Sequence, residues 1–242
     1  MSPIAANLNA VRARIAAAAQ SAGRDPHSIR LLAVSKTWPA SDVSAAFEAG
    51  QYAFGENYAD ELGAKAAELA HFPLIEWHFI GALQSNKTRV VAENCAWAHG
   101  IGRLKIAERL SAQRPENLPP LQICLQVNVS GEASKSGVPI EEAVPLAHAV
   151  AALPRLVLRG LMCIPEPTGD VALLRRRFAL LRELNEQLKS AGLAVDTLSM
   201  GMSHDLEAAI AEGATIVRVG TAIFGSRPSR AQTDHTEGVV SQ

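Results

Sequence analysis

Beyond its N-terminal segment, the chain alternates between short apolar runs and longer stretches with apolar residues at helical spacing. The short runs predict eight strands, at Arg30–Ser35, Tyr52–Gly55, Glu76–Ile80, Ala96–Ile101, Leu121–Val129, Leu158–Ile164, Thr197–Met200 and Ile216–Phe224. The longer stretches predict helices between them, at Ala40–Ala49, Tyr58–Ala70, Gln84–Glu93, Arg103–Gln113, Ile140–Ala152, Val171–Ala191 and His204–Glu212. Before the first strand, four residues at helical spacing predict a further amphipathic helix: Ile4, Leu8, Val11 and Ile15.

This alternation predicts the fold. Strands that alternate with helices favour right-handed crossovers and a parallel sheet. Eight such units in about 220 residues favour a closed barrel over an open sheet. We therefore predict an α/β protein with one (β/α)8 TIM barrel and an extra N-terminal helix, over residues 1–227. The polar stretch 228–242 lacks periodicity and predicts a flexible C-terminal tail.

Composition narrows the function classes. The 242 residues are 48% hydrophobic, enough for a sizeable core, and a formal net charge of −1 gives no reason to expect nucleic acid or an anionic membrane as partner. No apolar segment is long enough to span a bilayer. Three cysteines lie in apolar runs without C-x-x-C spacing, which is typical of small buried hydrophobes in a reducing compartment. We expect a cytoplasmic protein.

The lysine at the end of the first predicted strand is the first candidate for chemistry, because barrels carry their chemistry at the C-terminal ends of strands. Lys36 directly follows the apolar run LLAVS. Partial desolvation favours the neutral amine, which is a nucleophile and forms a Schiff base with an aldehyde. Alternatively, its stem packs on the barrel while its ammonium group reaches water. Position alone favours this second interpretation.

Residues near the C-terminal end of the predicted barrel favour the nucleophile interpretation of Lys36. Ser203 stands at a predicted helix start, and Gly220 and Thr221 end the eighth predicted strand, where barrels often bind phosphate. A phosphate site opposite a nucleophilic lysine indicates a phosphorylated aldehyde, and pyridoxal 5′-phosphate is the obvious candidate. An ordinary helix cap at Ser203 and a tight bend at Gly220 explain each residue separately.

Arg218 lies inside the same strand, on the face that Gly220 shares. A guanidinium group there could donate to the pyridine nitrogen of the cofactor. Because arginine does not give up its proton, that nitrogen would stay unprotonated. The resulting weak electron sink suits a carrier or a racemase better than a transaminase. A salt bridge to a neighbouring carboxylate is the alternative.

Other motifs carry less weight. GALQSNKT (81–88) nearly matches a nucleotide phosphate loop, but Asn86 replaces the second glycine, so we reject that reading. The seven histidines show no metal-binding spacing, and we expect no metal. His78 lies within the third predicted strand and fits a core position as well as a functional one.

Several motifs together resemble the pyridoxal phosphate homeostasis protein family: LLAVSKTWP, FGENY, EWHFIGALQSNK, SGEASKSGV, LRGLMCI, LSMGMSHDLEAAI and VRVGTAIFG. The resemblance runs in family order over residues 5–227. It implies a TIM barrel related to the N-terminal domain of alanine racemase, known as fold type III, with the cofactor held as a Schiff base on Lys36. It also implies that Ser203, Gly220 and Thr221 hold the phosphate, that Arg218 faces the pyridine nitrogen, that Asn57 lies near the ring and that Met200 lines the pocket. His78, Asn86 and Lys135 are possible accessory residues, and Lys135 is a candidate for contacting or transferring the cofactor.

The family implies a carrier rather than a catalyst. We expect a monomer that binds and buffers pyridoxal 5′-phosphate for vitamin B6 and amino-acid homeostasis, with pyridoxal phosphate-dependent apoenzymes as possible recipients. Alanine racemase uses a tyrosine base from a second domain, whereas the tyrosines of this chain are Tyr52 and Tyr58. Two alternatives stay open: a single-domain amino-acid racemase with Tyr58 as proton donor, and a Schiff-base aldolase that uses Lys36.

Overall fold

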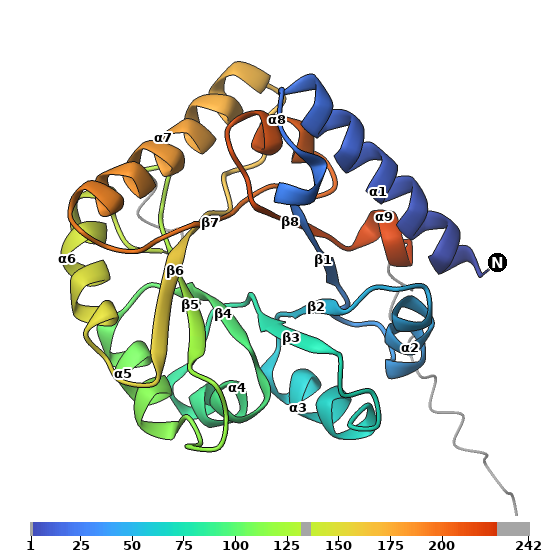
Figure 1. The fold of residues 1–242 in the computed structure, drawn as a ribbon, viewed down its shortest axis with the longest axis horizontal. Helices are drawn as coiled ribbons and strands as arrows, with labels where there is room; N and C mark the ends of the chain where they lie inside the picture. The colour runs from blue at the N-terminus through green and yellow to red at the C-terminus, as the bar shows by residue number, and fades with distance from the viewer. Residues whose placement is uncertain (1, 132–136, 227–242) are drawn as a thin grey trace, which may run out of the picture.

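Eight parallel strands close a barrel in the order of the chain (Figure 1). The computed structural model describes residues 2–131 and 137–226. The strands are β1 Arg30–Val34, β2 Ala53–Glu56, β3 Glu76–Phe79, β4 Trp97–Ile101, β5 Leu121–Gln126, β6 Leu156–Met162, β7 Thr197–Ser199 and β8 Ile216–Val219. Pairing of β8 with β1 closes the ring, with Leu32 opposite Arg218 in the register. The predicted (β/α)8 barrel is confirmed.

Helices form the outer ring around the barrel (Figure 1). The α-helices are α1 Pro3–Ser21, α2 Ala40–Glu48, α3 Ala59–Glu68, α4 Thr88–Asn94, α5 Leu104–Gln113, α6 Ile140–Ala151, α7 Val171–Ser190, α8 Leu206–Ala211 and α9 Thr221–Phe224, with 3-10 turns η1 Pro26–Ser28 and η2 Ser85–Lys87. The predicted extra helix is α1, which packs against α2, α8 and α9. It buries the predicted apolar face, including Leu8, Val11 and Ile15.

Strand alternation divides the buried apolar residues into two layers. A smaller cluster fills the barrel interior, where Leu32, Cys124 and Met162 meet. A larger cluster lies between the barrel and the helices. All three cysteines are buried and unpaired, and burial raises the pKa of Cys124 and Cys163 to about 12, so they pack as small hydrophobes.

Two predicted elements need correction near the barrel mouth. The eighth strand was predicted to run to Phe224 but ends at Val219, and Thr221–Phe224 forms α9 instead. A short apolar run does not distinguish a strand from a turn of helix, and here the chain turns at Gly220, whose carbonyl accepts from the Ile223 N–H at 2.8 Å.

The helix after β7 also starts later than predicted. Ser203 was predicted to stand at its start, but α8 begins at Leu206 and Ser203 lies in the preceding turn. The Asp205 carboxylate accepts from the Met202 N–H at 2.5 Å. This side-chain-to-backbone bond closes a turn that competes with the helix.

No helix in residues 2–131 and 137–226 is long and apolar enough to cross a membrane. Lys135 and the predicted tail at 228–242 lie outside the described residues.

A tight contact between β6 and β7 gives a stability test. A Cβ atom at Gly160 would lie 1.9 Å from the Thr197 carbonyl oxygen, whereas one at the exposed Gly169 would meet nothing within 4 Å. We expect Gly160→Ala to lower the free energy of unfolding by about 3 kcal/mol and Gly169→Ala to change it by less than about 0.5 kcal/mol. Urea unfolding followed by circular dichroism measures both, and equal stabilities would contradict this packing.

Candidate functional site

A cavity of about 230 Å³ opens at the C-terminal ends of the strands. Six of the predicted cofactor-binding residues line it, and they come from the ends of four strands: Lys36, Asn57, Ser203, Arg218, Gly220 and Thr221. The apolar part of its wall is formed by Val34, Ile80 and Ile164. The barrel therefore gathers into one site residues that lie up to 185 positions apart in the chain (221 − 36).

Lys36 lies two residues beyond β1, in a turn, and is partly buried. Its neighbours are fixed on both sides. The Ser35 N–H donates to the Gly55 carbonyl at 3.0 Å, and the Thr37 N–H donates to Glu61 Oε1 at 2.5 Å. Thr37 has φ +68°, an unusual backbone conformation for a β-branched residue. This turn carries Lys36 from the strand end into the cavity wall.

A buried ionic cluster holds that turn in place. Lys65 of α3 donates from Nζ to the Ser35 carbonyl, to Glu56 Oε1 and to Glu61 Oε1, each at 2.7 Å. The Ser35 hydroxyl also donates to Glu56 Oε1, at 2.6 Å. Glu56 is fully buried, and this burial raises its pKa although the Lys65 ammonium group opposes the shift.

The role of Lys65 was not predicted from the sequence. Its spacing of four residues from Glu61 is typical of a solvated helix pair, and that pattern does not reveal burial. The additional signal was Glu56, which directly ends an apolar strand and needs a cation when buried.

Arg218 lies at the floor of the cavity and is 3% exposed. Its guanidinium group donates to the Ser199 carbonyl at 2.5 Å, to Ser199 Oγ at 2.8 Å and to the Cys163 carbonyl at 2.8 Å. Burial lowers its pKa, but arginine stays protonated in proteins. Within the described part of the chain its partners are neutral carbonyl and hydroxyl oxygens, and no carboxylate there forms an ion pair with it, so these residues give no support to the salt-bridge alternative.

The opposite wall is built from two loops that approach closely. A Cβ atom at Gly220 would lie 3.0 Å from the Val34 carbonyl oxygen, so the contact between the ends of β8 and β1 favours glycine. The Ser203 loop is held from outside by α1, where Arg14 donates to the Ser203 carbonyl at 2.8 Å and pairs with Glu207. Sequence reasoning missed Arg14, because nothing in its helical pattern distinguishes it from a solvated arginine.

Three further predicted residues lie elsewhere. Met200 is fully buried but does not line the cavity. The preceding residue, Ser199, points into the barrel, so the Met200 side chain faces the helices. Met202 lines the cavity instead. Asn86 is exposed in η2. His78 is fully buried inside the barrel, where its ring contacts His99.

The cavity suits an anionic ligand that also carries a hydrogen-bond donor. Lys36 and Arg218 supply two cationic groups, and none of the described lining residues is acidic. Among the described residues, the buried Oδ1 atom of Asn57 has no hydrogen-bond partner, which leaves an acceptor available at the wall. Buried polar atoms usually have partners, so this atom marks a place where a ligand donor fits.

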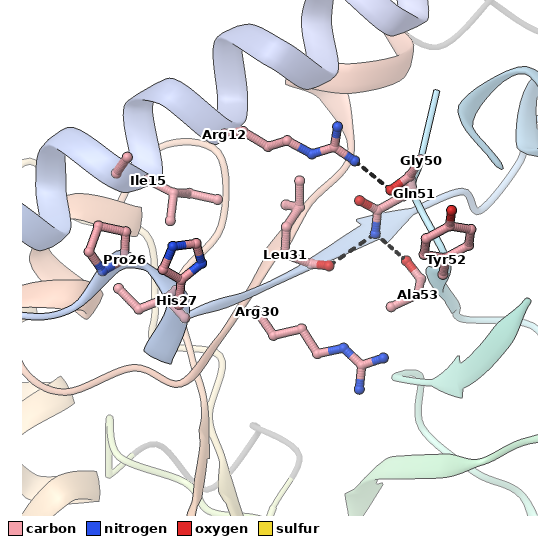
Figure 2. A pocket seen from close by; sticks show the side chains of 12 residues that line it. Arg12, Ile15, Pro26, His27, Arg30, Leu31, Gly50, Gln51, Tyr52 and Ala53 are labelled. Carbon is pink, nitrogen blue, oxygen red and sulfur yellow. Dashed lines mark hydrogen bonds between the residues drawn. The ribbon is translucent and has the colours of Figure 1, made fainter. Parts of the chain in front are cut away.

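A second cavity, of about 430 Å³, lies at the N-terminal ends of β1 and β2 (Figure 2). Several of its polar groups already have partners within the protein. Arg12 donates to the Gly50 carbonyl at 2.8 Å, Gln51 donates to the carbonyls of Leu31 and Ala53, and Arg30 pairs with Glu76 at 2.7 Å. None of the predicted cofactor-binding residues lines this cavity. No group of three or more potential metal ligands occurs within the described part of the chain.

Comparison with known proteins gives consistent matches. The family model of the alanine racemase N-terminal domain matches residues 6–228. The pyridoxal phosphate homeostasis protein of Pseudomonas aeruginosa is 62% identical over 227 residues, covering 94% of this chain and 97% of the relative. The protein of the same name from Escherichia coli K12 is 53% identical over 232 residues, covering 94% and 98%.

Solved structures agree on the fold. A structure described as an unknown protein from Bifidobacterium adolescentis superposes with a TM-score of 0.87 at 38% identity, covering 92% of this chain and 94% of that one. PipY of Synechococcus elongatus, with PLP bound, gives a TM-score of 0.81 at 36% identity, covering 92% and 100%. An alanine racemase of Clostridium difficile gives 0.70 at 16% identity, covering 94% and 57%, a likeness of fold alone.

The ionic cluster beneath Lys36 predicts a pH-dependent defect. In Lys65→Met, Glu56 is buried without its cation, and we expect a loss of about 3–5 kcal/mol in the free energy of unfolding near pH 7. The pKa of Glu56 in the folded variant then lies further above its unfolded value, so the folded state binds more protons. Stability relative to wild type therefore falls as pH rises and recovers towards about pH 5.

Urea unfolding at several pH values measures this difference. The double variant Glu56→Gln/Lys65→Met is the control, because it removes both charges, and it should regain much of the loss. A Lys65→Met defect that does not change with pH would show that the cluster is not what stabilises this turn.

Proposed function

The chain belongs to the pyridoxal phosphate homeostasis protein family, and on that premise we propose that it binds pyridoxal 5′-phosphate and serves vitamin B6 and amino-acid homeostasis without strong catalysis of its own. The observation that carries the proposal is the meeting of Lys36, Arg218 and the Ser203, Gly220 and Thr221 loops around one cavity. The cofactor in the PipY structure supports the choice of ligand.

We assign the covalent link to Lys36. When bound, pyridoxal 5′-phosphate supplies an aldehyde that a primary amine can attack. Nζ of Lys36 would form the new C=N bond of a Schiff base, and the aldehyde oxygen would leave as water with the two amine hydrogens. The fixed backbone at Ser35 and Thr37 holds the Cα of Lys36 at the cavity wall, so attachment orders the lysine side chain but not the backbone that carries it.

The other wall residues fit the remaining parts of the cofactor. The hydroxyl groups of Ser203 and Thr221 are donors suited to a phosphate, and Gly220 allows its backbone to approach closely. The unpartnered Oδ1 of Asn57 can accept from a polar ring substituent or a bound water.

Arg218 favours a carrier over a strong catalyst. Its bonds to Ser199 and Cys163 use three of its five N–H groups, and a further one can face a ring nitrogen in the cavity. Because the guanidinium group keeps its protons, the ring nitrogen stays unprotonated and withdraws electrons weakly. That chemistry suits storage and transfer of the cofactor.

The arrangement of the tyrosines supports the same conclusion. Tyr58 is 56% exposed and lines a separate cavity of about 180 Å³ beside Gln84 and Lys87 rather than the Lys36 cavity. Tyr52 lines the cavity at the opposite end of the barrel. We further propose that the protein acts as a cytoplasmic monomer and delivers the cofactor to pyridoxal phosphate-dependent apoenzymes.

An absorption spectrum tests the assignment of Lys36. We expect wild-type protein with added pyridoxal 5′-phosphate to show a yellow band that borohydride bleaches while fixing the cofactor covalently. Lys36→Ala should lose this fixation completely. Lys87→Ala should retain it, because Lys87 lines the separate cavity beside Tyr58 and pairs with Asp60. A wild type that stays colourless would refute the proposed cofactor and would bring back the aldolase alternative, which predicts condensation of small aldehydes.

Chiral chromatography tests the racemase alternative. We expect the cofactor-loaded protein to leave L-alanine and L-serine unconverted, because no tyrosine lines the Lys36 cavity among the described residues. Turnover at about 1 s⁻¹ or faster, in the range of ordinary enzymes, would overturn the carrier proposal. Loss of that turnover in Tyr58→Phe would then identify Tyr58 as the second proton-transfer group.

A further inference from the structure

A chain of hydrogen bonds runs through the barrel interior, away from Arg218. Ser199 Oγ lies 2.8 Å from His99 Nδ1, His99 Nε2 lies 2.9 Å from His78 Nδ1, and His78 Nε2 lies 2.7 Å from Glu76 Oε1. Both histidines and Ser199 are fully buried, and they come from β4, β3 and β7. Glu76 ends the chain near the other mouth of the barrel, where it pairs with Arg30.

The two ends of this hydrogen-bond chain determine the direction in which each of its bonds is donated. Arg218 has only donors, so Ser199 Oγ must accept from it. An ionised Glu76 has only acceptors, so His78 Nε2 must carry a proton and donate to it. A neutral His78 then accepts at Nδ1 from His99 Nε2–H, and His99 accepts at Nδ1 from the Ser199 hydroxyl. Every donor therefore points from Arg218 towards Glu76.

The electrostatics agree with these neutral tautomers. Burial lowers the pKa of His78 to about 4 and that of His99 well below its ordinary value, the latter helped by the nearby charges of Arg218 and Arg30. Burial alone would raise the pKa of Glu76, but the bonds from His78 and Arg30 outweigh it and lower the pKa to about 2. Near neutral pH both histidines are uncharged and Glu76 is ionised.

Packing of neighbouring rings keeps the hydrogen-bonded histidines in this arrangement. The Trp97 ring stacks on His78, with 5.4 Å between centroids and 6° between planes, and Arg159 covers the Trp97 ring at 5.1 Å. The imidazole of His78 therefore cannot turn over without displacing a buried indole. A reversal of the chain would also need a donor at Glu76, which the ionised carboxylate lacks.

We propose that Glu76, His78, His99 and Ser199 are positioning residues for Arg218, because their directed chain keeps Ser199 Oγ as an acceptor and so aims the remaining guanidinium N–H groups at the cavity. The proposal rests on the proposed function, since the ring nitrogen of the bound cofactor is the acceptor that these N–H groups would meet. It assigns a role in binding to residues that lie below the cavity and do not line it.

The matched pair His99→Phe and His99→Gln tests the proposal. Phenylalanine fills the site without hydrogen bonds, so the Ser199 hydroxyl loses its acceptor and can turn its proton against the guanidinium group. Glutamine can accept from Ser199 and donate to His78, which preserves the direction of the chain. We expect pyridoxal 5′-phosphate to bind about tenfold more weakly to His99→Phe, with a shifted absorption maximum, and within about twofold of wild type to His99→Gln.

Two further measurements separate positioning from misfolding. Thermal melting identifies a variant that fails to fold, and Ser199→Ala, which removes the acceptor from Arg218 directly, should weaken binding in the same direction as His99→Phe. Wild-type affinity and spectrum in both folded variants would overturn the proposal. The proposal would also be overturned if folded His99→Gln bound the cofactor as weakly as His99→Phe. The direction of the hydrogen bonds would then not be the cause of the weaker binding.

Nitrogen NMR of 15N-histidine-labelled protein, recorded without cofactor, tests the chain independently. We expect His78 and His99 to be neutral Nε2–H tautomers near pH 7. An imidazolium or an Nδ1–H tautomer at either residue would overturn the assigned direction. If wild type fails to bind pyridoxal 5′-phosphate but both histidines are neutral Nε2–H tautomers, the proposed function is wrong. The assigned direction of the hydrogen bonds is then still supported.

Discussion

The pairing of β1 with β8 is the constraint on which the rest of the structure depends. It closes the barrel and sets Leu32 beside Arg218, so the lysine that follows β1 and the loop that follows β8 reach the same mouth. The same register brings Gly220 against the Val34 carbonyl, where a larger residue would push the two strand ends apart. Residues from both ends of the chain thus meet because the sheet has no edge.

Two buried cations near this mouth are compensated in different ways. Lys65 is surrounded by carboxylates, and its charge is used to hold the turn that carries Lys36. Among residues 2–131 and 137–226, Arg218 meets carbonyl and hydroxyl oxygens and no carboxylate, so its charge is solvated by dipoles but not neutralised. The first arrangement stabilises the fold, while the second leaves positive potential for an anionic ligand.

The barrel interior is correspondingly less apolar than its outer layer. A histidine pair, a serine and an arginine occupy inward positions beside Leu32, Cys124 and Met162. Buried polar groups are costly unless they are paired. Here the polar groups from Arg218 through Ser199, His99 and His78 bond to one another in sequence, and Glu76 supplies the last acceptor at the partly exposed end.

Hydrophobic periodicity was sufficient to predict the barrel, its extra helix, the place of Lys36 just after the first strand and that of Arg218 inside the eighth, because strand and helix periods depend on local backbone geometry. It failed where a local side-chain bond or a single turn changed an element, as at Asp205 and Gly220. Contacts between residues distant in sequence could not be predicted. They include the bond from buried Lys65 to Ser35, the bond from Arg14 to the Ser203 carbonyl and the hydrogen bonds that connect Arg218 with Glu76. These contacts depend on which side chains the closed barrel brings within hydrogen-bonding distance. The spacing of residues along the sequence does not determine which side chains those are.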